Sequence, residues 1–171
     1  MSSSACDQGV RIQRLLPDDW ERYRSIRLAG LTEAPTAFGS SLAHEIAMTE
    51  EVWRNRLAGR AQFAAIWQGN TVGTVGGAQD RENASQALLV GMWVSPDARR
   101  MGIGEMLVRA VVEWGTAEGF PTIKLWVTEG NDVAERLYAR CGFARTGAAG
   151  RPDFSNPDHD ALVEMEYRIE R

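Results

Sequence analysis

A basic segment with two glycines, residues 99–104 (RRMGIG), has the residue types and the setting that phosphate binding requires. The residues before it, 88–94, are apolar, β-branched or aromatic, which predicts a strand that ends before Pro96. The residues after it repeat apolar side chains at helical spacing from 107 to 114. A strand, a glycine loop and a helix in this order leave backbone N–H groups free at the helix N-terminus, where the helix dipole favours an anion. The segment is therefore predicted to bind an anion through its backbone.

Two common nucleotide-binding loops fit this segment poorly. A P-loop requires a lysine and a hydroxyl residue after its second glycine, where Glu105 and Met106 stand. A Rossmann loop requires a third glycine, where Leu107 stands, and glycines directly at the strand end, whereas residues 95–101 intervene. Glu129 stands roughly where a ribose-binding acid would be, so a nicotinamide-dependent oxidoreductase stays open as an alternative. A turn that needs glycine only for its shape is the structural alternative.

A second informative segment, residues 128–143 (TEGNDVAERLYARCGF), predicts a capped helix. Asn131 is a residue type that caps helix N-termini, and Gly142 stands where a left-handed residue ends a helix. The apolar line of this helix consists of Ala134, Leu137, Tyr138 and Cys141. By spacing alone, a tyrosine on this line is a core residue. The residues before the segment, 122–127, predict a strand that pairs in parallel with strand 88–94 through the helix between them.

Composition limits the classes of protein that this chain can belong to. A length of 171 residues with 44% hydrophobic and 25% charged residues suits one soluble domain, which we place at residues 10–171 after a disordered tail, 1–9. A net charge of −4 argues against nucleic acid as the main partner. The two cysteines and two histidines form no cluster, so we expect no metal site, and a reducing cytoplasm fits. No export signal or membrane span is predicted.

The remaining elements must cover and support these two segments. A helix from Asp18 onward and two short helices within residues 42–59 are predicted to form a cover that contacts substrate. Two strands, 62–67 and 71–79, form a predicted hairpin. Arg27 lies one helical turn after Tyr23, and it is either a helix-end charge or an anchor for a substrate carboxylate.

The two segments together resemble the Gcn5-related N-acetyltransferases, the GNAT family. The pattern Gln/Arg-x-x-Gly-x-Gly/Ala matches residues 99–104, and Asn-x-x-Ala-x-x-Leu-Tyr-x-x-x-Gly-Phe matches residues 131–143. The strong part of the resemblance runs from Leu88 to Phe143, about a third of the chain. It implies an α/β (α+β) fold with a central mixed, mostly antiparallel, twisted sheet of six to seven strands. Helices are then expected on both faces, and the two central strands, 88–94 and 122–127, are expected to splay apart.

The resemblance also implies acetyl-coenzyme A (acetyl-CoA) as the co-substrate, and no metal. Its pyrophosphate is expected on the loop amides and its pantetheine arm along the strand that ends at Val94. Glycine in the loop is expected to leave room for the phosphates. The cofactor-binding residues that follow from this are Met92, Trp93, Val94, Arg99, Arg100, Met101, Gly102, Ile103, Gly104, Glu105, Asn131, Ala134 and Tyr138.

The chemistry needs a proton donor for the leaving thiolate and a base for the attacking amine. The resemblance assigns the donor to Tyr138, and a backbone N–H within residues 92–94 is expected to polarise the thioester carbonyl. Glu129 is the first candidate for the base, with Glu45 and a chain of water molecules as alternatives. No cysteine stands in a reactive position of either motif, so we expect direct attack in a ternary complex.

These inferences lead to a functional hypothesis with one main alternative. The chain is predicted to be an N-acetyltransferase that moves an acetyl group to a primary amine of a small molecule or peptide. The alternative is a non-catalytic module that binds or senses acyl-CoA. Acids in the cover and in residues 153–160 suit a cationic acceptor. A homodimer is possible, and neither nucleic acid nor a membrane is an expected partner.

Overall fold

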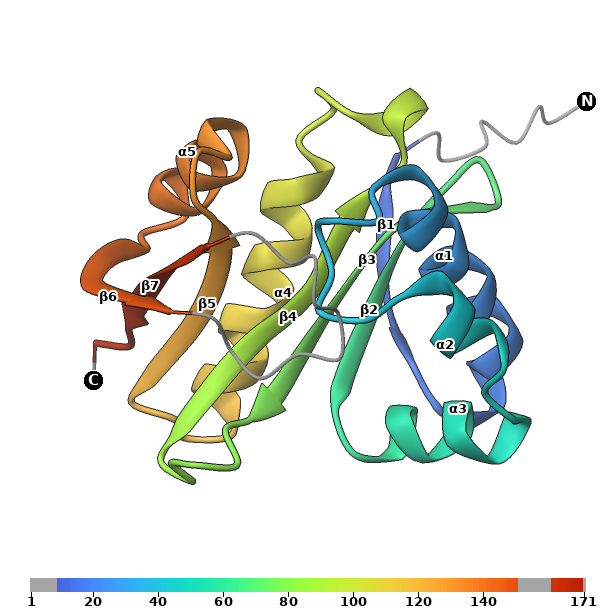
Figure 1. The fold of residues 1–171 in the computed structure, drawn as a ribbon, viewed down its shortest axis with the longest axis horizontal. Helices are drawn as coiled ribbons and strands as arrows, with labels where there is room; N and C mark the ends of the chain where they lie inside the picture. The colour runs from blue at the N-terminus through green and yellow to red at the C-terminus, as the bar shows by residue number, and fades with distance from the viewer. Residues whose placement is uncertain (1–8, 151–160, 171) are drawn as a thin grey trace, which may run out of the picture.

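The computed structural model describes residues 9–150 and 161–170, which form a mixed sheet between two layers of helices (Figure 1). The predicted tail, apart from its last residue, and the acidic residues 153–160 lie outside the described residues. The strands are β1 (Arg11–Leu15), β2 (Ala61–Trp67), β3 (Asn70–Gln79), β4 (Gln86–Val94), β5 (Thr122–Thr128), β6 (Ala144–Gly150) and β7 (Leu162–Arg168). The helices are α1 (Trp20–Glu33), α2 (Leu42–Ile46), α3 (Glu50–Ala58), α4 (Ile103–Ala117) and α5 (Asp132–Arg140), with short 3-10 turns at Pro17–Asp19 and Pro96–Ala98.

The described strands form one seven-stranded sheet in the order β1-β2-β3-β4-β5-β7-β6. Only the central β4–β5 pair is parallel, and its two strands are joined through α4. All other neighbours are antiparallel. This topology confirms the predicted fold class, and it excludes the doubly wound parallel sheet that a Rossmann oxidoreductase requires.

Each face of the sheet carries its own hydrophobic core. One core packs α4 and α5 against the sheet, with Leu107, Val108 and Val111 of α4 completely buried. The other packs α1 and α3 against β1 and β2, with Tyr23 and Trp53 in edge-to-face contact at its centre. Helices α1 to α3 therefore cover one face of the sheet and α4 and α5 cover the other (Figure 1).

The two central strands separate after a short paired stretch. β4 and β5 pair only from Gln86↔Thr122 to Leu88↔Lys124. Beyond that point β4 continues along β3 and β5 continues along β7. One edge of β4, from residue 89 to residue 94, is thus left without a strand partner, and the facing edge of β5 is left likewise. The predicted splay is present at the carboxyl ends of the two strands.

β4 is also bulged within this unpaired stretch. Trp93 lies opposite Thr74 and Val90 opposite Gly76, so two residues of β4 face one of β3. Gly91 has a φ of 60°, a backbone conformation that favours glycine. A Cβ atom at Gly91 would stand 2.9 Å from Nη1 of Arg27 on α1. The bulge therefore brings the backbone of β4 directly against an α1 arginine.

Candidate active site

The loop before α4 presents free backbone N–H groups, as the sequence predicted. Arg100 and Gly102 both have positive φ, 65° and 76°, and Gly102 caps the helix in a left-handed conformation. Arg99 N–H bonds the carbonyl of Pro96 and Met106 N–H bonds that of Gly102. Among the described residues, no N–H from residue 100 to residue 105 has an acceptor. This run of donors at a helix N-terminus is suited to hold an anion.

Glycine is required at the two loop positions, 102 and 104, for different structural reasons. A Cβ at Gly102 would meet nothing within 4 Å, so its requirement is the backbone conformation. A Cβ at Gly104 would stand 2.9 Å from Cδ2 of Leu137 and 3.4 Å from Cε of Met92. Gly104 therefore allows close packing of α4 against α5. The expectation that its missing side chain leaves room for phosphate is wrong, because that side of Gly104 faces the protein.

Arg99 is engaged within the protein. Its Nε donates to the carbonyl of Val94 at 3.0 Å and its Nη2 to Oε2 of Glu33 at 2.9 Å. The same carboxylate oxygen accepts the indole N–H of Trp93 at 2.8 Å. The Trp93 hydrogen bond is the main cause of the lowered pKa of Glu33, and Arg99 adds to it. Arg99 thus ties the end of α1 to the end of β4, while the neighbouring Arg100 side chain has no partner among the described residues.

The other loop residues hold α4 in place. Ile103 is buried beneath the first turn, and Met101 is 41% exposed. Glu105 forms an ion pair with Arg140 of α5 at 3.0 Å. The loop is therefore fixed from both sides, by packing below and by α5 beside it.

Tyr138 lies on α5, close to the first turn of α4. Its side chain is buried, and its ring packs edge-to-face on Phe143 with centroids 6.0 Å apart. The hydroxyl makes no hydrogen bond to another described residue. Burial raises the pKa of the Tyr138 hydroxyl well above its ordinary value of 10.0. The phenol is thus protonated at neutral pH and has a proton to give.

Two further predicted residues lie between β5 and α5, and a third, Ala134, lies in the first turn of α5. Glu129 is exposed directly after β5, and its backbone N–H bonds the carbonyl of Ala161 at 2.8 Å. Oδ1 of Asn131 accepts the N–H of Ala134 at 3.2 Å, so Asn131 is a helix cap here. Because β4 and β5 are parallel, this segment and the loop before α4 emerge at the same edge of the sheet (Figure 1).

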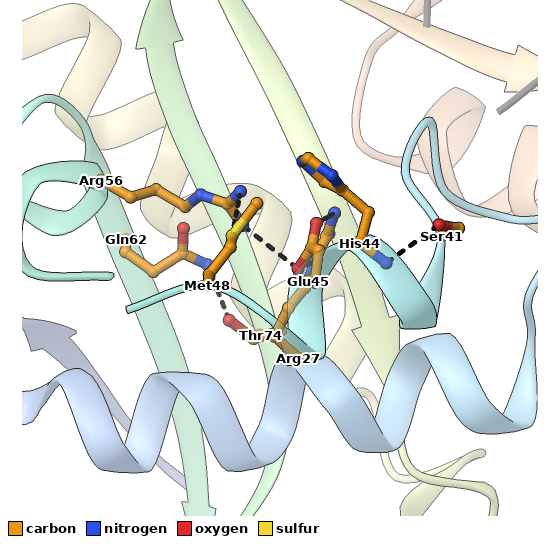
Figure 2. A network of polar contacts seen from close by, with 8 residues as sticks. All are labelled: Arg27, Ser41, His44, Glu45, Met48, Arg56, Gln62 and Thr74. Atoms are coloured by element: carbon orange, nitrogen blue, oxygen red, sulfur yellow. Dashed lines mark hydrogen bonds and ion pairs between the residues drawn. The ribbon is translucent and has the colours of Figure 1, made fainter. Parts of the chain in front are cut away.

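A buried ion cluster on the opposite face was not recognised from the sequence. Figure 2 shows Glu45 of α2 between Arg27 of α1 and Arg56 of α3. Arg27 bonds both carboxylate oxygens, at 2.9 and 2.8 Å, and Arg56 bonds one of them at 3.2 Å. Glu45 has no exposed surface. Burial alone would raise the pKa of Glu45, but the hydrogen bonds and charge of Arg27, with the charge of Arg56, hold it below its ordinary value.

This arrangement changes the interpretation of two residues. Glu45 is a structural counter-charge for arginines, which makes it a poor base for an amine. Arg27 points inward across the sheet face, which a helix-end charge would not do. The signal in the sequence was its place on the face of α1 that also carries the buried residues Tyr23, Ile26 and Gly30.

The described part of the chain has neither a candidate metal site nor a candidate membrane span. No group of three or more His, Cys, Asp or Glu side chains there is placed to hold a metal ion. Of the helices described, none has the length and apolar character needed to cross a bilayer.

The chain matches a known protein family over most of its length. The sequence model of the acetyltransferase (GNAT) family matches residues 19–143. The chain therefore belongs to the GNAT acetyltransferase family.

Individual relatives agree with this assignment. A rice (Oryza sativa subsp. japonica) protein described as acetyl transferase GW6a is 36% identical over 83 residues, which are 48% of this chain and 18% of the rice protein. A GNAT acetyltransferase from Streptococcus pneumoniae has the same fold, with a TM-score of 0.73 and 20% identity over 94% of this chain and 100% of that one. The PaiA N-acetyltransferase from Thermoplasma acidophilum, solved in complex with coenzyme A, aligns with a TM-score of 0.69 and 16% identity over 94% and 99% of the two chains.

Proposed function

We propose that this protein transfers the acetyl group of acetyl-CoA to a primary amine of a small molecule or peptide, by direct attack in a ternary complex. The observation that carries the proposal is the run of unpartnered N–H groups from Arg100 to Glu105 beside the unpaired edge of β4. A pyrophosphate satisfies the first feature, and an extended arm with amide groups satisfies the second. Family membership supports the same ligand.

The binding residues follow from these two features. The backbone from Arg100 to Glu105 holds the pyrophosphate, and Arg100 adds positive charge beside it. The β4 edge at residues 92–94 pairs with the pantetheine arm, and the amide side chain of Asn131 contacts the same arm. Arg99 acts as a positioning residue, since it fixes the ends of α1 and β4 relative to each other.

The catalytic roles fall to residues around the splay. Bound acetyl-CoA supplies an activated acetyl thioester. A backbone N–H within residues 92–94 polarises its carbonyl, and the Tyr138 hydroxyl gives a proton to the departing sulfur. Its hydroxyl has no hydrogen-bond partner among the described residues, so it is free to donate in this role. Glu129, exposed beside α5, accepts the amine proton directly or through water.

A thiol-release assay tests the proposal. The protein is incubated with acetyl-CoA and a panel of primary amines and amine antibiotics, and free coenzyme A is measured against hydrolysis without amine. We expect amine-dependent release together with an acetylated amine of matching mass. Binding of acetyl-CoA in calorimetry, with no release above hydrolysis for any amine, would instead establish the non-catalytic acyl-CoA sensor.

A further inference from the structure

The ion cluster around Glu45 contains more positive than negative charge. Arg27 and Arg56 share the single carboxylate of Glu45, and a third arginine, Arg60, lies beside them. Among the described residues, no other carboxylate pairs with any of these arginines. Placing uncompensated positive charge away from water is costly, so the cluster is suited to receive an anion.

Arg60 is the arginine without a partner. Its guanidinium makes no hydrogen bond or ion pair with a described residue, although the side chain is half-buried. Its stem packs over β3, where Cδ lies 3.3 Å from the Cβ position of Gly76. Burial lowers the pKa of Arg60 below its ordinary value, and the charges of Arg56 and Arg27 act in the same direction.

A second polar group beside Arg60 is also unsatisfied. Gln62 is 1% exposed, and its Nε2 donates to Oγ1 of Thr74 at 2.7 Å. Its Oε1 has no donor, and it lies 2.9 Å from the same Cβ position of Gly76 that Arg60 approaches. The unpaired amide oxygen of Gln62 and the stem of Arg60 thus lie over the same point of β3. A buried acceptor without a donor is unusual in a folded protein.

The cluster lies against the part of β4 where transfer is proposed. Arg27 uses Nε and Nη2 for Glu45, while Nη1 points to the bulge at Gly91. Val90, one residue earlier, has its Cγ2 atom 3.0 Å from the Cβ position of Gly76. Arg27 and Arg56 keep 11% and 17% side-chain exposure, so the cluster is not sealed from solvent.

Resting on the proposed function, we propose that the amine acceptor also carries a carboxylate, held by Arg60 and by the free Nη1 of Arg27. Two guanidinium groups offer the planar donors that a carboxylate accepts. Glu45 fixes Arg27 and Arg56 in place and is itself a positioning residue. The acceptor is then a small amino acid or a related zwitterion. Glu45, one of the acids of the cover, faces inward and is neutralised by arginines, so it does not itself favour a cationic acceptor.

Matched pairs of acceptors test this proposal. Each α-amino acid is compared with its own primary amide, using kcat/KM from coenzyme A release. The amino group of the amide is less basic than that of the acid, so at a given pH a larger fraction of it is unprotonated and able to attack. Without a carboxylate site, the amide would therefore be the better acceptor. We expect the wild type to prefer the acid in spite of this, by at least about tenfold for the best pair, the size of one charge-assisted hydrogen bond. Equal rates, or preference for the amide, overturn the proposal.

Two variants separate the carboxylate site from a structural role. R60Q is expected to lower the acid-to-amide ratio about tenfold, because the acid loses a charge-assisted hydrogen bond and the amide loses only a weaker one. R54Q removes an arginine of α3 that pairs with Asp18 and Glu50 at the surface, and it is expected to leave the ratio unchanged. Because Arg60 has no partner to lose, R60Q is expected to melt no lower than wild type. An unchanged ratio in R60Q overturns the proposal.

A binding experiment keeps this inference apart from the proposed function. Amino acids are titrated into the coenzyme A-bound protein by calorimetry, with wild type and R60Q in parallel. Binding that R60Q weakens supports the carboxylate site even where no amine releases coenzyme A, and in that case the transfer proposal alone fails. A different result would overturn the carboxylate site alone. In that result, amines that lack a carboxylate release coenzyme A, but no amino acid binds; the transfer proposal then still stands.

Discussion

Replacing Glu45 by glutamine removes one negative charge from the ion cluster with almost no change in side-chain shape. The glutamate accepts three guanidinium N–H groups, at 2.9 and 2.8 Å from Arg27 and at 3.2 Å from Arg56. A glutamine has one acceptor oxygen and one NH2 group, so at least one guanidinium N–H then faces another donor. The arginines also lose their shared counter-charge. E45Q is therefore expected to destabilise the fold.

The size of the loss follows from the burial of the cluster. Removing one partner of a buried ion pair costs about 3–5 kcal/mol, because the remaining charge stays buried. We take the lower value, about 3 kcal/mol, since one glutamine oxygen still accepts a hydrogen bond. For a domain of this size each kcal/mol shifts Tm by roughly 2–4 °C. The expected fall in Tm at neutral pH is thus about 6–12 °C.

Thermal unfolding followed by circular dichroism measures this shift, with E50Q as the matched control. Glu50 pairs with Arg54 one turn later in α3, but its side chain is 54% exposed, so E50Q is expected to have a Tm close to that of wild type. Adding R60Q to E45Q removes one of the uncompensated charges, and the double variant is expected to recover part of the lost stability.

The pH dependence gives a second test of the same charge. The pKa of Glu45 in the folded state lies below its ordinary value of 4.5. Its contribution to stability is therefore complete above that ordinary value and is lost as pH falls through the lowered pKa. The difference in Tm between wild type and E45Q should narrow below about pH 4. A Tm of E45Q within about 2 °C of wild type at neutral pH, or a gap that widens on acidification, would refute the reasoning.

Four further expectations concern the proposed active site and the loop before α4. Y138F should lower kcat by about 10²-fold or more, and it should leave the affinity for coenzyme A unchanged because the hydroxyl has no structural partner. Steady-state kinetics measure the first quantity and calorimetry the second. Equal rates in Y138F and wild type would remove Tyr138 from the mechanism. E129Q should lower kcat for amine acetylation by about 10²-fold, because the amine then loses its proton acceptor, whereas an unchanged rate would leave water as the base. G104A places a Cβ 2.9 Å from Leu137, so we expect a loss of about 1–3 kcal/mol in denaturant unfolding. G102A strains the left-handed cap by about 1–2 kcal/mol and should weaken coenzyme A binding. Full stability in G104A would contradict the close packing of Gly104 on Leu137. Unchanged affinity in G102A would contradict the role of the left-handed cap in shaping the loop.

The parts of the structure that the sequence predicted well rest on local rules. Glycine at position 102 is needed for a positive φ before a helix, and Asn131 caps the next helix through a contact three residues away. The parallel pairing of β4 and β5 follows from the helix between them. Each of these features is determined within a few residues or by one connection, so the amide loop could be located without a structure.

The features that sequence analysis missed depend on contacts between distant segments. Glu45 looks like a solvated acid in the sequence, yet its partner Arg27 is 18 positions away and brings α1 and α2 together. Arg99 looks like a phosphate ligand, yet it pairs with Glu33, which is 66 positions away. A charged residue's neighbours are decided by packing of whole elements, which no local pattern specifies.

Gly76 of β3 and Gly91 of β4 show how a local sequence feature can depend on contacts between distant segments. In the sequence they weaken the strands, because glycine contributes no side chain to a sheet. In the fold the space at Gly76 is filled by the stem of Arg60 and the amide of Gln62, and the space at Gly91 by the guanidinium of Arg27. Any larger residue at either position would push these side chains off the sheet. The glycines thus let polar groups of the α1–α3 face reach the backbone of β4 beside its unpaired edge, where an apolar strand would have excluded them.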